Sequence, residues 1–229
     1  MPVEDQLIIA LDVPSVDEAQ AIVEALGPRA QFFKIGYQLM SVGGFDLART
    51  LIAEGKFVFL DLKFHDIGNT VEKGVASVRN LGASMLTVHA EPDVLRGAVA
   101  GRGDEKTLKI MAVTVLTSMS QESLARLGIT TPIETLVLER AEMAVAAGAD
   151  GVIASAREAA AIRKAFGEAL LVVTPGIRPA GTSADDQKRV VTPRAALDKG
   201  ASHLVVGRPI VAAPDPRAAL EVILAQMSG

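Results

Sequence analysis

The sequence has no cysteine and no tryptophan in its 229 residues, and aromatic residues make up only 3% of it. Without cysteine, the chain cannot form disulfide bonds or thiolate metal sites. Hydrophobic residues nevertheless make up 49% of the chain, so a sizeable core must be filled mainly by Ala, Val, Leu and Ile. Such a filling is typical of parallel α/β proteins.

The chain also lacks basic runs and long apolar runs. Its formal net charge is -4, and no cluster of Lys and Arg offers a binding surface for a nucleic-acid backbone. No apolar stretch is long enough to cross a membrane. Glu4 and Asp5 stand where a signal peptide would carry basic residues. We therefore expect a cytoplasmic protein with neither a membrane nor a nucleic-acid partner.

What the sequence does contain is a regular alternation of short apolar runs and segments with helical periodicity. Helical segments include residues 16–26, 71–81, 133–147 and 214–227. The apolar runs that we interpret as strands are residues 7–11, 32–35, 57–62, 85–89, 109–115, 151–154, 170–174 and 204–206.

Eight strands that alternate with helices over this length predict an α/β fold, the (β/α)8 TIM barrel. An open doubly wound sheet is the alternative. No Gly-x-Gly-x-x-Gly follows the first strand and no Walker A sequence is present, which favours the barrel. Because no linker-like or low-complexity segment divides the chain, we expect residues 1–229 to form a single catalytic domain.

Three charged residues come at the end of the apolar run 57–60: Asp61, Lys63 and Asp66. Residues two apart in a strand share a face, so Asp61 and Lys63 should point the same way, with Asp66 just beyond the strand. Unpaired buried charges are costly, so such a group is either a structural ion-pair network or a functional site. Three charges at one strand end favour chemistry.

Other polar residues follow the same rule of position, because chemistry in a barrel is carried at the carboxyl ends of its strands. Lys34 is embedded in apolar neighbours near the end of the second predicted strand. Further polar residues at or just beyond strand ends are Asp12, His89, Thr117, Arg178 and Arg208.

The loops after the seventh and eighth strands are the common phosphate site of this fold. Here they contain Gly176 with Arg178 and Gly207 with Arg208. Glycine lets backbone N–H groups approach an anion, and a guanidinium can donate two hydrogen bonds to it. The long polar segment 178–189 is then expected to act as a lid over the phosphate.

A divalent cation is the alternative ligand for a site at the carboxyl ends of the strands. Asp12, Asp61 and Glu91 carry the oxygen ligands that such an ion prefers. Lys34 and Lys63 would repel it, so we expect no metal.

Together these residues resemble the orotidine 5′-phosphate decarboxylase family over essentially the whole chain. The family's Asp-x-Lys-x-x-Asp signature is matched by Asp61, Lys63 and Asp66. Three further matches follow in the family's order: residues 113–118, residues 174–179 with Gln187, and residues 206–209.

The resemblance implies a homodimer that needs no cofactor and converts orotidine 5′-monophosphate to UMP and CO2 in de novo pyrimidine synthesis. It implies that Lys63 gives a proton to C6, that Asp61 lies beside the substrate carboxylate, and that Lys34 joins their charge network. It further implies that Asp12 binds the ribose and that Thr117 contacts the pyrimidine. Phosphate binding is implied for Gln187, Gly207 and Arg208, with Arg178 at the base of the closing loop. Asp66 and Thr70 are implied to reach into the partner's site.

Two alternatives stay open at this point. A Mg²⁺-dependent sugar-phosphate lyase or decarboxylase of the same superfamily, such as 3-keto-gulonate-6-phosphate decarboxylase, would share the Asp-x-Lys-x-x-Asp pattern. Its relatives carry an acidic residue where this chain has Lys34, which disfavours that reading. A non-catalytic barrel that only binds a nucleotide is disfavoured by the intact set of lysines and carboxylates.

Overall fold

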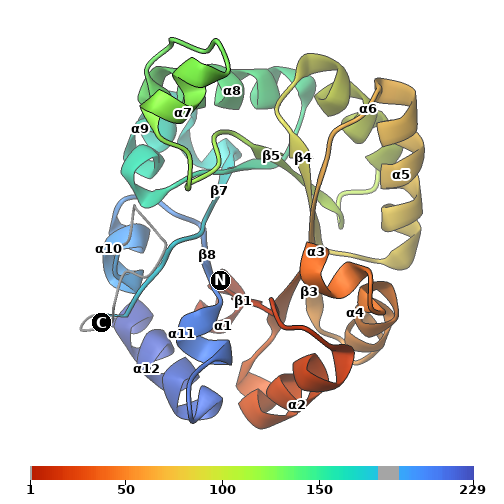
Figure 1. Cartoon of the computed structure of the whole chain (residues 1–229), viewed down its shortest axis with the longest axis vertical. Coiled ribbons are helices and arrows are strands. Elements are labelled where there is room, and N and C mark those ends of the chain that lie inside the picture. Colours follow the sequence, from red (N-terminus) through yellow and green to blue (C-terminus); the bar gives the residue numbers. More distant parts are fainter. Residues whose placement is uncertain (1, 180–190) are drawn as a thin grey trace.

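The computed structural model describes residues 2–179 and 191–229. Within these residues, eight parallel strands pair in chain order and close into a barrel, with helices around the outside (Figure 1). This arrangement confirms the predicted (β/α)8 fold. The strands are β1 (Leu7–Ala10), β2 (Phe32–Gly36), β3 (Phe57–Phe64), β4 (Met85–His89), β5 (Lys109–Val113), β6 (Gly151–Ile153), β7 (Leu171–Thr174) and β8 (His203–Val206).

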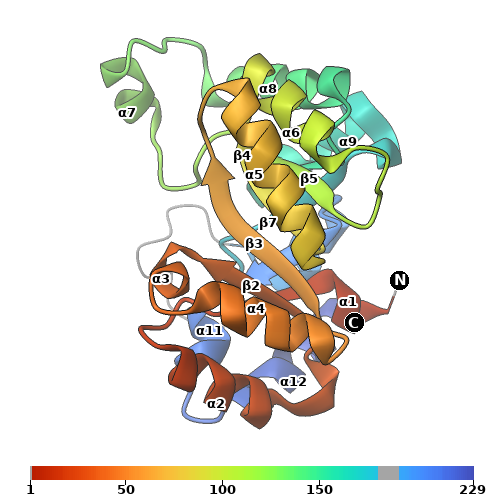
Figure 2. The ribbon, with the colours of Figure 1, turned by 90° about the vertical axis from the view of Figure 1, so that its right-hand side faces the viewer.

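The helices form the outer layer, and α7 stands away from the barrel wall (Figure 2). None of the helices in the described part of the chain is long and apolar enough to cross a membrane. The α-helices are α1 (Val3–Gln6), α2 (Val16–Leu26), α3 (Tyr37–Met40), α4 (Gly44–Ala53), α5 (Gly68–Leu81), α6 (Pro92–Arg102), α7 (Gln121–Arg126), α8 (Ile133–Ala147), α9 (Ala156–Phe166), α10 (Pro193–Asp198), α11 (Arg208–Val211) and α12 (Pro216–Ser228). Two short 3-10 helices cover Gly27–Arg29 and Gly167–Ala169.

The predicted bounds of α2, α8 and β4 are confirmed at both ends. Local signals explain this agreement for the helices. The Ser15 side chain accepts a hydrogen bond from the Glu18 N–H at the start of α2, and Gly148 ends α8 with a left-handed φ of 81°. Such caps are encoded by one or two residues and need no tertiary information.

Two predicted strand ends were wrong by two residues each. β3 continues to Phe64 rather than ending at Leu62, because a register shift lets its pairing with β4 resume at Val88. β5 ends at Val113, and the next residue, Thr114, uses its hydroxyl to bind the Ile153 carbonyl. Both ends depend on neighbouring strands, which a local pattern does not contain.

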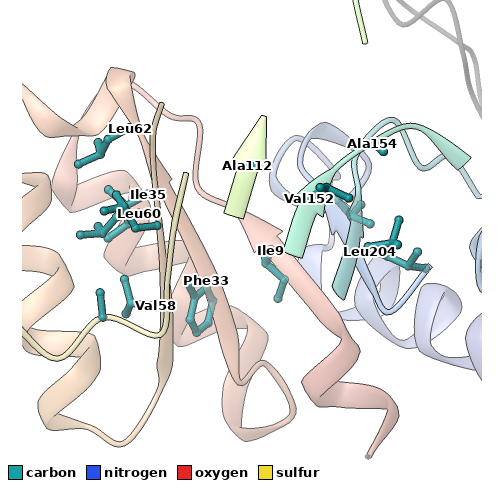
Figure 3. Packing of buried hydrophobic residues seen from close by; sticks show 14 of the residues in the cluster. Ile9, Phe33, Ile35, Val58, Leu60, Leu62, Ala112, Val152, Ala154 and Leu204 are labelled. Atoms are coloured by element: carbon teal, nitrogen blue, oxygen red, sulfur yellow. The ribbon is translucent and has the colours of Figure 1, made fainter. Parts of the chain in front are cut away.

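The core has two layers. A small cluster fills the inside of the barrel and includes Phe32, Phe59 and Met111. A larger one lies between the strands and the helices, where Figure 3 shows Val58 and Leu60 packed with residues of neighbouring strands. Alternation along β3 therefore places Phe59 inside the barrel and its two neighbours outside. The same alternation carries the next inward positions to the mouth of the barrel.

Candidate active site

A cavity of about 510 Å³ opens at the carboxyl ends of the strands. This is the end of the barrel at which chemistry is expected from the fold. Ile153, Val205 and the inward-facing Phe59 form part of its apolar lining. Eight of the predicted site residues line it: Asp12, Lys34, Asp61, Lys63, Thr117, Arg178, Gly207 and Arg208.

The charged residues form an alternating chain of acid and base. The Lys34 Nζ lies 2.9 Å from Asp12 Oδ1 and 3.4 Å from Asp61 Oδ2. The Lys63 Nζ lies 2.8 Å from Asp61 Oδ1. Lys34 is only 7% exposed, and two carboxylates offset the loss of its hydration. Gly36 leaves room for this network, because a Cβ there would lie 3.2 Å from the Lys34 Nζ.

Asp61 is the centre of this network. Burial by itself would raise the pKa of the Asp61 carboxyl. The Lys34 and Lys63 ammonium groups oppose burial, helped by hydrogen bonds from Lys63 and Thr87, and the net result is a pKa below its usual value. Asp61 is therefore a carboxylate at neutral pH, placed where it would face any anionic group that enters the cavity.

Lys63 has an unusual backbone. Its φ is 46°, and it is the single non-glycine residue with positive φ in the described part of the chain. A non-glycine residue in this region is strained by about 1–3 kcal/mol and persists only when its surroundings hold it. The Tyr37 hydroxyl donates to the Leu62 carbonyl at 2.7 Å, directly before Lys63. The Thr87 hydroxyl accepts from the Lys63 N–H at 2.9 Å.

Asp66 and Thr70 do not join the cavity of their own chain. Both are exposed, and Asp66 Oδ1 accepts a hydrogen bond from the neighbouring Ile67 N–H. The expectation that all three charges of the signature crowd one strand end is thus wrong within a single chain. Among the described carboxylates, Lys63 forms an ion pair with Asp61 and not with Asp66.

The predicted phosphate loops follow β7 and β8, and β8 pairs with β1 on the next side of the barrel. Gly176 has a φ of 79°, which glycine adopts without strain. Arg178 is 8% exposed and, like Gly207 and Arg208, lines the cavity. Gln187 and most of the predicted lid, residues 180–189, lie outside the described residues.

The histidines stand apart from the cavity lining. The rings of His65 and His89 stack with centroids 4.6 Å apart, and the Nε2 of His65 lies 3.7 Å from Glu91 Oε2. His65 is exposed. His203 is 4% exposed on β8, and burial lowers its pKa to about 4.

Several neighbours of the site were missed from the sequence. Gln38 and Leu116 line the cavity, while Tyr37 and Thr87 hold the backbone around Lys63. Thr87 left one weak signal, since it is a hydroxyl residue between the apolar Leu86 and Val88 of a strand. The candidate metal ligands Asp12 and Asp61 both contact Lys34.

A closed parallel barrel with a partly buried acid–base network at the ends of β1, β2 and β3 and glycine–arginine loops after β7 and β8 defines a TIM-barrel enzyme built for a small anionic substrate. Residues 5–223 match the family described as "Orotidine 5'-phosphate decarboxylase / HUMPS family". The chain belongs to this family.

Individual relatives agree over nearly the full length. Proteins named orotidine 5'-phosphate decarboxylase from Rhodopseudomonas palustris (strain BisB5) and Methylorubrum extorquens (strain PA1) are each 54% identical, over 98% and 97% of this chain and 95% of each relative. The crystal structure of the Lactobacillus acidophilus orotidine 5'-phosphate decarboxylase has a TM-score of 0.86 and 38% identity, covering 97% of this chain and 99% of that one.

Proposed function

We propose that this protein decarboxylates orotidine 5′-monophosphate to UMP and CO2 in pyrimidine synthesis, without a cofactor, as a cytoplasmic homodimer. The observation that carries the proposal is the alternating network of Asp12, Lys34, Asp61 and Lys63 in the cavity. Two further observations support it: the chain belongs to the family, and relatives named orotidine 5'-phosphate decarboxylase are 54% identical to it over nearly its full length.

The reaction explains why such a network is useful. Loss of CO2 from C6 leaves an electron pair that no neighbouring carbonyl delocalises in the ordinary way. A protein without a cofactor must stabilise it with fixed charges. The Lys63 ammonium would oppose the negative charge at C6 and then donate its proton there. Lys34 and Asp61 would hold that ammonium in place, because a fixed network needs no rearrangement during the reaction.

Asp61 would lie against the departing carboxylate. Its lowered pKa keeps it charged, so it repels the substrate carboxylate and not the CO2 that leaves. This difference favours the transition state over the bound substrate. Asp12 would bind the ribose hydroxyls, and Thr117 would contact the pyrimidine.

Stabilisation of the charge at C6 does not account for the whole rate enhancement. The most proficient enzymes lower the barrier by about 23 kcal/mol or more, while one general acid contributes about 10²–10⁴-fold. Binding of the distant phosphate must therefore help, by driving closure and excluding water. Gly207, Arg208 and Gln187 would bind the phosphate, with Arg178 at the base of the closing loop.

The partner subunit would complete the site. Asp66 and Thr70 are exposed and do not line their own chain's cavity, as expected of residues that enter a neighbouring site. Ile67, next to Asp66 in the chain, is 70% exposed and would offer apolar surface for the contact. In the dimer, the partner subunit would supply the second carboxylate beside Lys63.

The direct test follows the ultraviolet absorbance of orotidine 5′-monophosphate with purified protein, with and without EDTA. Loss of the substrate spectrum that EDTA leaves unchanged supports the proposal. Activity that EDTA abolishes would favour the metal-dependent lyase. Tight UMP binding without turnover would favour the non-catalytic barrel.

A further inference from the structure

We propose that Thr87 is a positioning residue that holds both Asp61 and the Lys63 backbone in their working geometry. This inference rests on the proposed function and adds a residue that the sequence motif does not contain. Thr87 lies on β4, is fully buried at 0% exposed, and does not line the cavity. It therefore acts through its two neighbours.

The pairing of the strands creates the need for such a residue. β3 pairs with β4 at Leu60↔Leu86 and again at Phe64↔Val88, with a register shift between these pairs. Residues 61–63 of β3 thus face one residue of β4, which is Thr87. Extra residues in one strand leave ladder positions without backbone partners. Both Asp61 and Lys63 lie in this interrupted stretch.

One hydroxyl group serves both residues. The Thr87 Oγ1 accepts from the Lys63 N–H at 2.9 Å and donates to Asp61 Oδ1 at 2.9 Å. A threonine hydroxyl has a single proton, and the Lys63 N–H group can only donate a hydrogen bond. Its proton must therefore point to the carboxylate, which fixes the direction of both bonds. The same Asp61 oxygen accepts from the Lys63 Nζ at 2.8 Å.

These bonds close a small ring through the two site residues. The backbone bond holds Lys63 at its positive φ, and the side-chain bond holds the oxygen to which its ammonium is tethered. Loss of the hydroxyl would release both ends of Lys63 at once. The ammonium and carboxylate would still be present, but less well placed against C6. The chemical step should then suffer more than substrate binding, which depends on the phosphate and ribose contacts.

Thr87→Val tests this inference because it keeps the branched shape and removes the hydroxyl. We expect kcat to fall on the order of 10–100-fold, as for loss of a hydrogen bond to a charged group, with KM and UMP affinity changed by less than about threefold. Thr87→Ser, which keeps the hydroxyl, should restore kcat to within about threefold of the wild type. Thr87→Ala is measured as well, in case the Thr87→Val protein does not unfold cooperatively on heating. It should show the same fall in kcat.

Ser84→Ala is the matched control. Its hydroxyl also accepts from a β3 N–H, that of Val58 at 3.2 Å, but at the opposite end of the same strand pair. It should melt and turn over as the wild type does. If Ser84→Ala loses as much kcat as Thr87→Val, or if folded Thr87→Val or Thr87→Ala keeps wild-type kcat, the positioning role is wrong. The same holds if Thr87→Ser is as impaired as Thr87→Val.

A measurement without substrate separates this inference from the proposed function. Hydrogen exchange of the Lys63 amide should be faster in Thr87→Val than in the wild type and unchanged in Ser84→Ala. If the wild type is inactive but the Lys63 amide shows this exchange pattern, the proposed function and the kinetic role of Thr87 are overturned. The hydrogen bond from the Lys63 N–H to Thr87 is then still supported. Equal exchange in the wild type and Thr87→Val would overturn the positioning role even in an active enzyme.

Discussion

The Lys63 ammonium is tethered to Asp61, with Nζ and Oδ1 2.8 Å apart, although a register shift interrupts the strand between Leu60 and Phe64. The side chains share the inward face of β3, so the ion pair forms within one strand end. Asp61 in turn contacts Lys34 of β2 at 3.4 Å. The catalytic charges that we propose are thus fixed by the chain itself, while the partner's Asp66 would be added on dimer formation.

Lys63→Ala is expected to abolish decarboxylation and to leave UMP binding largely intact. The reason is that Lys63 acts at C6, whereas affinity comes mainly from the phosphate and ribose contacts. Turnover and UMP binding by calorimetry give the two quantities. Activity above about 1% of the wild type would contradict the assignment of Lys63 as the proton donor.

Arg208→Ala should weaken phosphate capture, with a loss in kcat/KM of about 10–100-fold, as expected for a bidentate charged contact. Orotidine without its phosphate should react very poorly with the intact enzyme, because phosphate binding is expressed in the transition state through closure. Arg194→Ala is a suitable control, since Arg194 forms an exposed pair with Asp198 on α10. Similar kcat/KM for orotidine and its phosphate would refute the remote-binding argument.

Subunit mixing tests the shared site. Lys63→Ala and Asp66→Ala chains should each be severely impaired alone. In a mixed dimer, one site would carry both changes and the other would take Lys63 from one chain and Asp66 from its partner. Activity should therefore rise well above that of either variant when subunits exchange. Absence of recovery, with exchange verified by mass spectrometry, would mean that Asp66 serves its own chain.

His203 should make stability depend on pH. Its pKa is about 4 in the folded protein because it is buried, against about 6.5 in an unfolded chain. The unfolded state therefore binds the proton first. The stabilisation is complete above the unfolded pKa and is lost as pH falls from about 6.5 towards 4. Asp61, whose pKa is lowered, contributes to a loss only in the more acidic range.

The free energy of unfolding in urea should accordingly fall by about 2 kcal/mol more between about pH 7 and about pH 5 in the wild type than in His203→Gln. His65→Gln is the control, because His65 is exposed and should leave this pH dependence as it is. Equal pH dependence in the wild type and His203→Gln would show that the buried imidazole does not govern this range.

Much of the barrel could be predicted because its elements carry local signals. Apolar runs, helical periodicity and caps such as Ser15 and Gly148 are set by neighbouring residues. Strand geometry predicted that Asp61 and Lys63 share a face, although Lys63 reaches the cavity with a positive φ. The convergence of the predicted polar residues around one cavity followed as well, since strand ends of a parallel barrel meet at one end.

What the sequence by itself determined was therefore the barrel, the gathering of polar residues at its carboxyl end and the family signature. Only the tertiary structure decided that Lys34 bridges Asp12 and Asp61, and that Asp66 does not line its own chain's cavity. It alone placed Thr87 opposite the interrupted stretch of β3. The physical reason is that strand pairing across the closed sheet fixes register, and register decides which distant side chains meet.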